Sequence, residues 1–380
     1  MADTTGERST PEHGPGPEAD PGRDASRGPG SDMESGRGEG APSRPISDAP
    51  AAPRHGRAHA ARPVGSRRGS RALRLVGVAV AVVLGTILAF AAVVLTGPPS
   101  VDDLLRESGL DDRRELLIGV KDDQPGVAFR DTDGVWSGFD IDIAHMIAED
   151  LGFRPNEVRF YAIESEDRAR MQATDDKKQR VGVDLVIASY SITPEREADN
   201  GVMFSAPYLS TEQSVLTLAN HPPVAGLEDL RGRKVCSLAT ATSVTAASQA
   251  EAVVIPRKRV SECFTALDKG EVEAISTDAA ILAGYKYRNY EKYSHHDIGL
   301  EATEAWGVNV GENEALRDLV NLTLYRSRED PADDRWEDAF DVNLRSEIDK
   351  NPGVPIAVAE QPRVKDKPNV REWPWERIEP

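Results

Sequence analysis

The segment from Asp184 to Leu209 places hydroxyl groups and a single arginine just after a predicted strand. The run from Leu185 to Ile187 has the composition of the end of a buried parallel strand. Ser189 and Ser191 follow it, where such strands present polar groups to a ligand. The segment therefore predicts a polar site at the exit of a strand.

A short helix is predicted to come next. Thr193 can cap it, and Pro194 suits its first position because proline has a fixed φ and no amide hydrogen to leave unpaired. Arg196 then lies in the first turn, where the helix dipole disfavours a cation. Since a guanidinium matches a carboxylate in two parallel hydrogen bonds, we expect Arg196 to take a carboxylate partner, from the protein or from a ligand.

Strands and helices are predicted to alternate around this segment. Leu117–Val120 is a short apolar strand, and apolar residues recur at helical spacing from Ile143 to Leu151, with Asp140 as the expected N-cap and Gly152 as the C-cap. A second strand, a polar helix around Arg168 and a third strand follow. This alternation favours right-handed βαβ crossovers in a parallel sheet, and hence an α/β fold.

Several of these segments resemble the family 3 bacterial solute-binding proteins. The stretch LLIGVKDDQPGVAFRDTDGVWSGFDIDIAHMIAEDLGF is similar to the family's opening strand, turn and first helix. DLRGRKVCSLATATSVTAAS and ECFTALDKGEVEAISTDAAILAGY resemble its second lobe, and EAWGVNVGENEALRDLVN its return to the first. The resemblance covers about residues 113 to 345 in the family's order. It implies a two-lobed type II periplasmic-binding-protein fold that binds an amino acid between the lobes.

The chain is expected to have five parts: a disordered tail (1–74), a transmembrane helix (75–95), a linker (96–112), a two-lobed solute-binding domain (113–350) and a C-terminal extension (351–380). Lobe 1 is expected at about 113–211 and 305–350, and lobe 2 at about 212–304. The crossings between them, Glu212–Leu218 and Glu301–Trp306, are the expected hinges for closure of the cleft.

The run Leu75–Leu95 has no charged residue and meets the requirement of about 20 residues for spanning a bilayer. A secretory signal peptide normally lies much nearer the N-terminus, even if Met33 is the start. No cysteine follows closely, which argues against a lipoprotein anchor. We therefore expect an uncleaved anchor, with a late cleaved signal peptide as the alternative.

Charges beside the apolar run indicate its orientation. Seven arginines precede it without an acid among them, and TGPPSVDDLL follows, so the positive-inside rule places the N-terminus in the cytoplasm and the domain outside the cell. The tail is rich in Gly, Pro, Ser, Asp and Arg, a composition typical of disorder. It is interpreted as a spacer, with a docking site for a cytoplasmic partner or for anionic lipid as the alternative.

The formal net charge is −18, which excludes nucleic acid as a partner of the domain. The two cysteines, Cys236 and Cys263, are both expected outside the membrane and in lobe 2, where a disulfide is favoured over two buried thiols. A metal site is not expected, because the cysteines form no CxxC pair and His295 and His296 are adjacent and expected to be solvated.

The resemblance assigns roles to the polar residues. It implies that Arg196 binds the ligand's α-carboxylate, that Ser189 and Ser191 contact the amino and carboxylate groups, and that Asp278 pairs with the ammonium, although Asp278 could simply cap the next helix. Thr242 lies where the family usually has a Gly-Ser-Thr-Ser turn. Here the run is Thr-Ala-Thr-Ser, so the glycine that permits close backbone approach is missing.

Two further cations indicate the ligand class. In relatives that bind glutamate or aspartate, a basic residue follows the first strand and an arginine precedes the next helix, and Lys121 and Arg168 stand at those places. Arg170 competes for the second role. The resemblance therefore implies an acidic amino acid, with glutamine or a basic amino acid as alternatives.

An enzyme is the less favoured alternative, because relatives with this fold include dehydratases and proteins with a lyase domain. Glu164, Glu166 or Asp123 would be the general acid or base, but nothing separates them from surface acids, and no length remains for a lyase domain. We expect a binding protein without a cofactor. It would serve the permease of an ABC importer, or act as a nutrient sensor that signals through the helix to a cytoplasmic partner.

Overall fold

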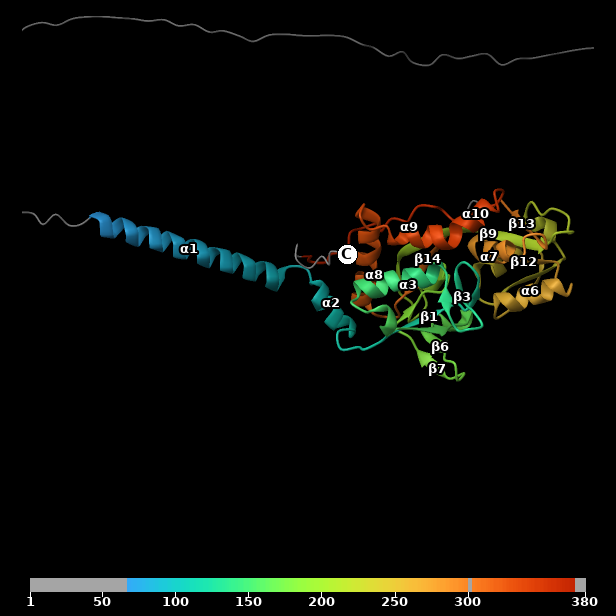
Figure 1. Ribbon diagram of the computed structural model, residues 1–380, viewed down its shortest axis with the longest axis horizontal. Coiled ribbons are helices and arrows are strands. Elements are labelled where there is room, and N and C mark those ends of the chain that lie inside the picture. The colour runs from blue at the N-terminus through green and yellow to red at the C-terminus, as the bar shows by residue number, and fades with distance from the viewer. Residues whose placement is uncertain (1–66, 300–302, 373–380) are drawn as a thin grey trace, which may run out of the picture. The chain divides into compact units, whose positions relative to one another are not determined.

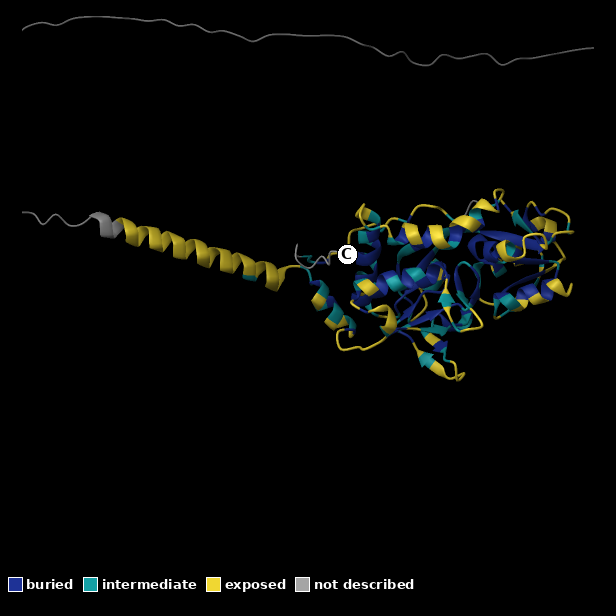
Figure 2. Cartoon of the chain, viewed as in Figure 1, coloured by how far each residue is buried: buried dark blue, intermediate teal, exposed yellow. Residues whose placement is uncertain are grey.

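The computed structural model describes residues 67–299 and 303–372 (Figure 1). Residues 1–66 of the expected tail lie outside this range. Helix α1 (Arg67–Thr96) begins before the apolar run, so the expected boundary at residue 74 falls inside a helix. Its stretch Arg71–Thr96 has 26 residues and a mean hydropathy of 2.9. None of its apolar window is buried, and Figure 2 colours the helix as exposed. By length and composition, it could cross a membrane.

Eleven strands form one continuous sheet. Their order is β11 (Val253–Arg257), β10 (Lys234–Leu238), β12 (Ala274–Asp278), β9 (Phe204–Leu218), β14 (Thr303–Asn309), β8 (Leu185–Val186), β1 (Leu116–Val120), β5 (Val158–Ala162), β6 (Gln172–Thr174) and β7 (Arg180–Gly182), with β13 (Tyr293–Asp297) also paired to β9. A separate small sheet consists of β2 (Asp123–Gln124), β3 (Ala128–Arg130) and β4 (Trp136–Ser137).

The helices lie between and around these strands (Figure 1). They are α2 (Val101–Ser108), α3 (Phe139–Asp150), α4 (Pro194–Glu197), α5 (Thr242–Gln249), α6 (Val260–Asp268), α7 (Ala279–Arg288), α8 (Glu314–Glu329), α9 (Arg335–Phe340) and α10 (Ser346–Asp349). Single turns η1 (Pro155–Glu157), η2 (Ser165–Asp167) and η3 (Leu227–Leu230), and the π-helical η4 (Asp341–Arg345), complete the set.

Parallel pairing defines the two lobes. In lobe 1, β1 is parallel to both β5 and β8, and in lobe 2, β10 is parallel to both β11 and β12. Strand β9 connects them: Phe204–Glu212 pairs with β14, and Gln213–Leu218 pairs with β12 and β13. The predicted two-lobed α/β fold is confirmed. Its two halves share β9, because this strand is long enough to serve both.

Apolar side chains on both faces of the parallel strands build the cores. In lobe 1, Ile118 on β1 and Ile147 on α3 are fully buried, and Trp306 on β14 lies beside them in the same cluster. In lobe 2, Ile275 on β12 and Phe264 on α6 are buried in the same continuous cluster. These contacts hold the carboxyl ends of β8 and β12 in place, and the candidate site residues follow those ends.

Two local expectations are wrong. Gly138, rather than Asp140, is the N-cap of α3: its carbonyl already accepts from two helical amides, and its φ of +122° suits only glycine. Asp140 instead turns into the core. The polar helix expected around Arg168 is only the turn η2, because the chain takes a positive φ at Met171 and enters the β6–β7 hairpin.

The C-cap expectation at Gly152 is confirmed. Gly152 has a φ of +87°, its amide donates to the Glu149 carbonyl, and the next amide, that of Phe153, donates to the Ala148 carbonyl. This pair of bonds forms a Schellman motif, which satisfies carbonyls at the end of α3.

After α10, the C-terminal extension returns to β9, where Ala357 pairs with Thr211 and the Thr211 hydroxyl donates to the Ile356 carbonyl at 2.6 Å.

Candidate functional site

Arg196 lies on α4, which begins as the sequence predicts. Thr193 is the N-cap, its hydroxyl accepting from the Arg196 amide at 3.3 Å, and Pro194 is the first helical residue. The guanidinium donates to the carbonyl of Ser191 at 2.7 Å and to that of Thr240, in lobe 2, at 2.8 Å. Both acceptors are neutral. Within the described residues, Arg196 therefore forms no ion pair, and its charge remains to be compensated.

Ser189 is held by groups from lobe 1. Its amide donates to Asp140 Oδ2 at 2.9 Å, and its hydroxyl donates to Gln124 Oε1 at 3.0 Å. Its φ of +44° is uncommon for a residue with a Cβ, and such conformations cluster at functional sites. Gln124 Nε2 is buried and has no hydrogen-bond partner in the described part of the chain. The Ser189 hydroxyl therefore already donates its hydrogen, whereas the neighbouring Gln124 amide nitrogen has no acceptor among the described residues.

Ser191 and Thr242 are brought together by one carboxylate. The Ser191 hydroxyl donates to Glu304 Oε2 at 2.5 Å, and the Thr242 hydroxyl donates to Glu304 Oε1 at 2.6 Å. Ser191 follows β8 in lobe 1, whereas Thr242 is the first residue of α5 in lobe 2. A single side chain of β14 thereby joins hydroxyls from both lobes.

Asp278 is buried at the end of β12, at the N-terminus of α7. It occupies the N-cap position but makes no side-chain capping bond, so capping does not explain why an acidic residue stands at this position. Oδ2 instead accepts from Trp306 Nε1 at 2.6 Å. Burial, followed by the charge of Glu304, raises the pKa of Asp278. A cation placed beside this carboxyl would lower its pKa and favour the charged form.

Lys121 is buried at the end of β1. Its Nζ donates to the Ile163 carbonyl at 3.1 Å and to the Ser165 hydroxyl at 2.9 Å. Burial, and next the charge of Arg168, lowers the pKa of Lys121 to about 7, against the opposing effects of nearby acids. An ammonium has three donors, so one remains for a ligand.

Arg168 is buried at the end of η2. Its Nε donates to the Ser165 carbonyl at 3.3 Å, and its Nη1 donates to the Ala188 and Ser189 carbonyls at 3.2 and 3.0 Å. Burial, then the charge of Arg196, lowers the pKa of Arg168 to about 10. Tyr190 lies between the two arginines, with its ring centroid 4.3 Å from Arg168 Cζ and 4.8 Å from Arg196 Cζ.

The seven predicted residues fall into two groups. Four of them are linked to one another through Glu304 and Trp306: Arg196, Ser191, Thr242 and Asp278. The other three, Lys121, Arg168 and Ser189, are linked through Ser165 and the Ser189 carbonyl. Sequence reasoning missed the chemistry of Glu304, Gln124 and Trp306. The one signal for Glu304 was an acid in the stretch that brings the chain back to lobe 1.

Lobe 2 contains the predicted disulfide. Cys236 on β10 and Cys263 on α6 are bridged across a sequence separation of 27 residues, and both are buried. The two histidines expected to be solvated are not: both are partly buried, His295 bonds to the Ser214 hydroxyl and His296 to that of Thr217, and burial lowers the pKa of His295 to about 3. Within the described residues, no group of three or more His, Cys, Asp or Glu could hold a metal ion.

Contacts between charged groups also link the lobes. Arg259, which precedes α6, lies 2.7 Å from Asp122 in lobe 1, and Lys258 lies 3.2 Å from Glu164. The amide and hydroxyl of Ser261 each donate to Asp123 Oδ2 at 2.9 Å, so a lobe 1 carboxylate caps a lobe 2 helix. Asp123, Glu164 and Glu166 were the candidate acids of an enzyme. The first two are used in these contacts.

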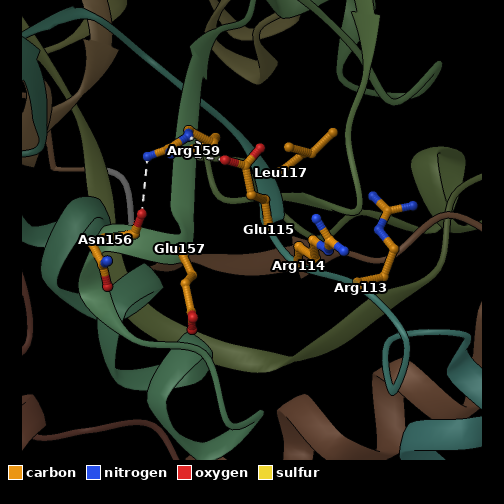
Figure 3. Close-up of a pocket in the computed structure, with 7 residues that line it drawn as sticks. All are labelled: Arg113, Arg114, Glu115, Leu117, Asn156, Glu157 and Arg159. Carbon is orange, nitrogen blue, oxygen red and sulfur yellow. Dashed lines mark hydrogen bonds and ion pairs between the residues drawn. The ribbon is translucent and has the colours of Figure 1, made fainter.

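A pocket among the described residues lies elsewhere. Its volume is about 530 Å³, and Figure 3 shows its lining at the starts of β1 and β5: Arg113, Arg114, Glu115, Leu117, Asn156, Glu157 and Arg159. Arg159 bonds to Glu115 and to the Asn156 carbonyl within it. None of the seven predicted ligand residues lines this pocket. It opens at the amino ends of parallel strands, the end opposite to that used for ligands in open α/β sheets.

Comparisons with known proteins agree with this fold. The glutamate-binding protein GluB of Corynebacterium efficiens is 30% identical over 239 residues, which cover 58% of this chain and 76% of the relative. The glutamine-binding protein GlnH of a Bacillus subtilis ABC transporter is 30% identical over 231 residues, 59% of this chain and 80% of that protein.

Among solved structures, an ancestral arginine-binding protein bound to glutamine is 27% identical, with a TM-score of 0.53, and the match covers 61% of this chain and 98% of that one. The family model of the bacterial extracellular solute-binding proteins, family 3, matches residues 116–339, which is more than half of the chain. The protein thus belongs to the bacterial extracellular solute-binding proteins, family 3, and the glutamate- and glutamine-binding relatives named above are solute-binding proteins.

Proposed function

We propose that this protein is the amino-acid-binding component of an ABC importer and that its ligand is glutamate or aspartate. The observation that carries the proposal is the row of three cations, Lys121, Arg168 and Arg196. The charge of Arg168 lowers the pKa of Lys121, and the charge of Arg196 lowers the pKa of Arg168; within the described residues none of the three forms an ion pair. Lys121 and Arg168 are buried, and Arg196 is partly buried. Burying unpaired cations is costly, so the row favours a ligand with more than one carboxylate.

Each ligand group then has its own partners. The α-carboxylate binds Arg196, supported by the hydroxyls of Ser191 and Thr242. The ammonium pairs with Asp278, whose raised pKa falls again when a cation arrives. The side-chain carboxylate binds Lys121 and the Nη2 of Arg168, which is not used in the three carbonyl bonds described above. Ser189 contacts the amino group from the β8 exit.

Glutamine is the second candidate, because the Bacillus subtilis relative is named a glutamine-binding protein and the ancestral structure contains glutamine. Calorimetric titration of the full chain in detergent distinguishes the two. We expect glutamate or aspartate to bind at least about tenfold more tightly than glutamine, since each charge-assisted bond contributes more than 1 kcal/mol. Tighter binding of glutamine or arginine contradicts the acidic ligand.

The membrane part of the proposal rests on α1, which holds the domain at the outer face of the cell membrane as an uncleaved anchor. An importer subunit and a sensor that signals to a cytoplasmic partner make different predictions. Removing the protein from cells is expected to abolish most high-affinity uptake of labelled glutamate if it serves an importer. Unchanged uptake together with a lost response to external glutamate would favour the sensor.

A further inference from the structure

Glu304 occupies the hydroxyl groups that a ligand carboxylate needs. Its two carboxylate oxygens accept from Ser191 and Thr242 at 2.5 and 2.6 Å. A hydroxyl has a single hydrogen to donate. Neither hydroxyl can therefore donate to Glu304 and to a ligand at the same time, so the two carboxylates exclude each other from this pair of donors.

The surroundings of Glu304 suit a bound carboxylate. Arg196 donates to the carbonyl of Ser191, one of the two hydroxyl residues, and reaches Thr240 in the turn that precedes Thr242. Asp278 is close enough for the charge of Glu304 to raise its pKa in part. A cation and an acid therefore lie near the Glu304 carboxylate, as they would lie near the carboxylate and ammonium of a bound amino acid.

The position of Glu304 on β14 gives this arrangement a mechanical role. Glu304 pairs with Thr211 on β9, where the chain passes between the lobes. Its side chain connects a lobe 1 loop to the first turn of α5 in lobe 2. The bridge thus holds the two lobes together, the action expected of a ligand.

We infer that Glu304 is an intramolecular competitor that sets the affinity of the site. In the protein without ligand, its carboxylate holds Ser191 and Thr242 and keeps the lobes together, and it leaves when the α-carboxylate of an amino acid arrives. Part of the ligand's binding free energy is spent on this exchange. The inference rests on the proposed function, because it assumes that the same two hydroxyls bind the ligand.

Titration of Glu304→Ala and Glu304→Gln in the full chain tests the competition. Both variants remove the carboxylate, so glutamate is expected to bind about tenfold more tightly or better, equivalent to the loss of one competing charge-assisted hydrogen bond. Glu337→Gln, which changes an exposed glutamate of α9, is the control and is expected to bind like the wild type. Unchanged or weaker binding in both Glu304 variants overturns the inference; weaker binding would make Glu304 a partner of the ligand's ammonium.

A second measurement needs no ligand. Spin labels at Val135→Cys in lobe 1 and Val253→Cys in lobe 2, both at exposed positions, report the distance between the lobes, while the native cysteines stay bridged. Without ligand, Glu304→Ala is expected to lengthen and broaden the distance distribution of the labelled wild type. An unchanged distribution overturns the bridge. If the wild type binds no amino acid but Glu304→Ala still opens the lobes, the proposed function fails and the bridge stands.

Discussion

At the scale of single residues, the site is defined by charges whose partners are neutral. Arg196 and Arg168 donate to carbonyls, and both guanidinium groups lie over the ring of Tyr190, which places a partly buried and a buried like charge near each other. Carbonyl dipoles and the ring's negative face reduce the cost of this arrangement without cancelling it. In the proposed function a ligand carboxylate completes the compensation, so removing one cation should affect ligand binding more than folding.

Arg196→Ala is expected to weaken binding of glutamate by about 2 to 5 kcal/mol, because it leaves one member of a desolvated charge pair without a partner. Arg196→Lys should recover only part of this loss, since an ammonium lacks the planar pair of donors. Titration of both variants, with the exposed Arg231→Ala as control, measures the effect. If either Arg196 variant bound glutamate with wild-type affinity, the role of Arg196 would be restricted to its hydrogen bond with the Thr240 carbonyl.

Lys121 makes binding of an acidic ligand depend on pH. Its pKa of about 7 leaves it mostly neutral at pH 8.5 in the free protein. A ligand carboxylate favours the charged form and raises this pKa, so binding takes up a proton and weakens as pH rises above about 7, by up to about tenfold per unit.

The comparison of two ligands isolates this effect. Asp278 responds to the ammonium of glutamate and glutamine alike, whereas only glutamate presents a second carboxylate to Lys121. Titrations at pH 6.5 and 8.5 should therefore show a greater loss for glutamate than for glutamine, and Lys121→Met should remove the difference. Equal pH dependence for both ligands in the wild type would argue against contact between Lys121 and the side-chain carboxylate.

Some of these residues could be found from the sequence alone. Ser189, Ser191 and Arg196 follow one strand within a few positions, so local rules were enough to group them. Glu304 and Gln124 could not be found that way, because their partners are 113 and 65 positions distant in the chain. Only the pairing of β14 with β9, and the packing of the loop after β1, bring them to the site.

At the scale of elements, helix α7 of lobe 2 packs closely against the backbone of lobe 1. Gly284 in α7 faces the loop before β3, and a Cβ at this position would lie 1.9 Å from the Pro125 carbonyl oxygen. Backbone cannot move aside as a side chain can. The close contact therefore requires glycine here, although an alanine would suit the helix better by about 1 kcal/mol.

Gly284→Ala is expected to destabilise the protein by about 1 to 3 kcal/mol and to weaken ligand binding, because α7 must move away from lobe 1. Gly182→Ala is the matched control, since a Cβ there would meet nothing within 4 Å. Thermal unfolding and titration of both variants make the measurement. If Gly284→Ala behaved like the control, the contact between α7 and Pro125 would not limit the approach of the lobes.

The elements that the sequence predicted well are those with strong local patterns. The parallel strands and α3 have continuous or periodic apolar residues, and α4 has a cap followed by proline. The polar residues around Arg168 have no apolar periodicity, so no pattern in the sequence distinguishes a turn from a helix there. The hairpin that follows depends on a positive φ at Met171, and methionine is not a residue type that signals a positive φ.

At the scale of the whole molecule, the expected topology is a cytoplasmic tail, a single span and an external domain. Protease added to intact cells should degrade the domain beyond Ser100 and spare the N-terminal tail, because the arginines before Leu75 stay on the cytoplasmic side. Immunoblots with antibodies against each part make the measurement, with cells lysed by detergent as the control.

The same experiment tests cleavage. An uncleaved anchor requires the tail and the domain in one polypeptide that sediments with membranes. Release of a soluble form that starts near Thr96 would show that the apolar run is a late signal peptide. It would also exclude signalling through the span.

The pairing of Ala357 with Thr211 has a kinetic consequence. At Thr211, β9 carries β14 on one side and the C-terminal extension on the other, so three backbone segments run together where the lobes join. If these bonds are intact in both the open and the closed protein but distorted during the transition, they raise the barrier to opening. They leave the free-energy difference between the two conformations unchanged. The extension should therefore slow opening and closing, and with them the exchange of ligand, while leaving the equilibrium affinity nearly the same.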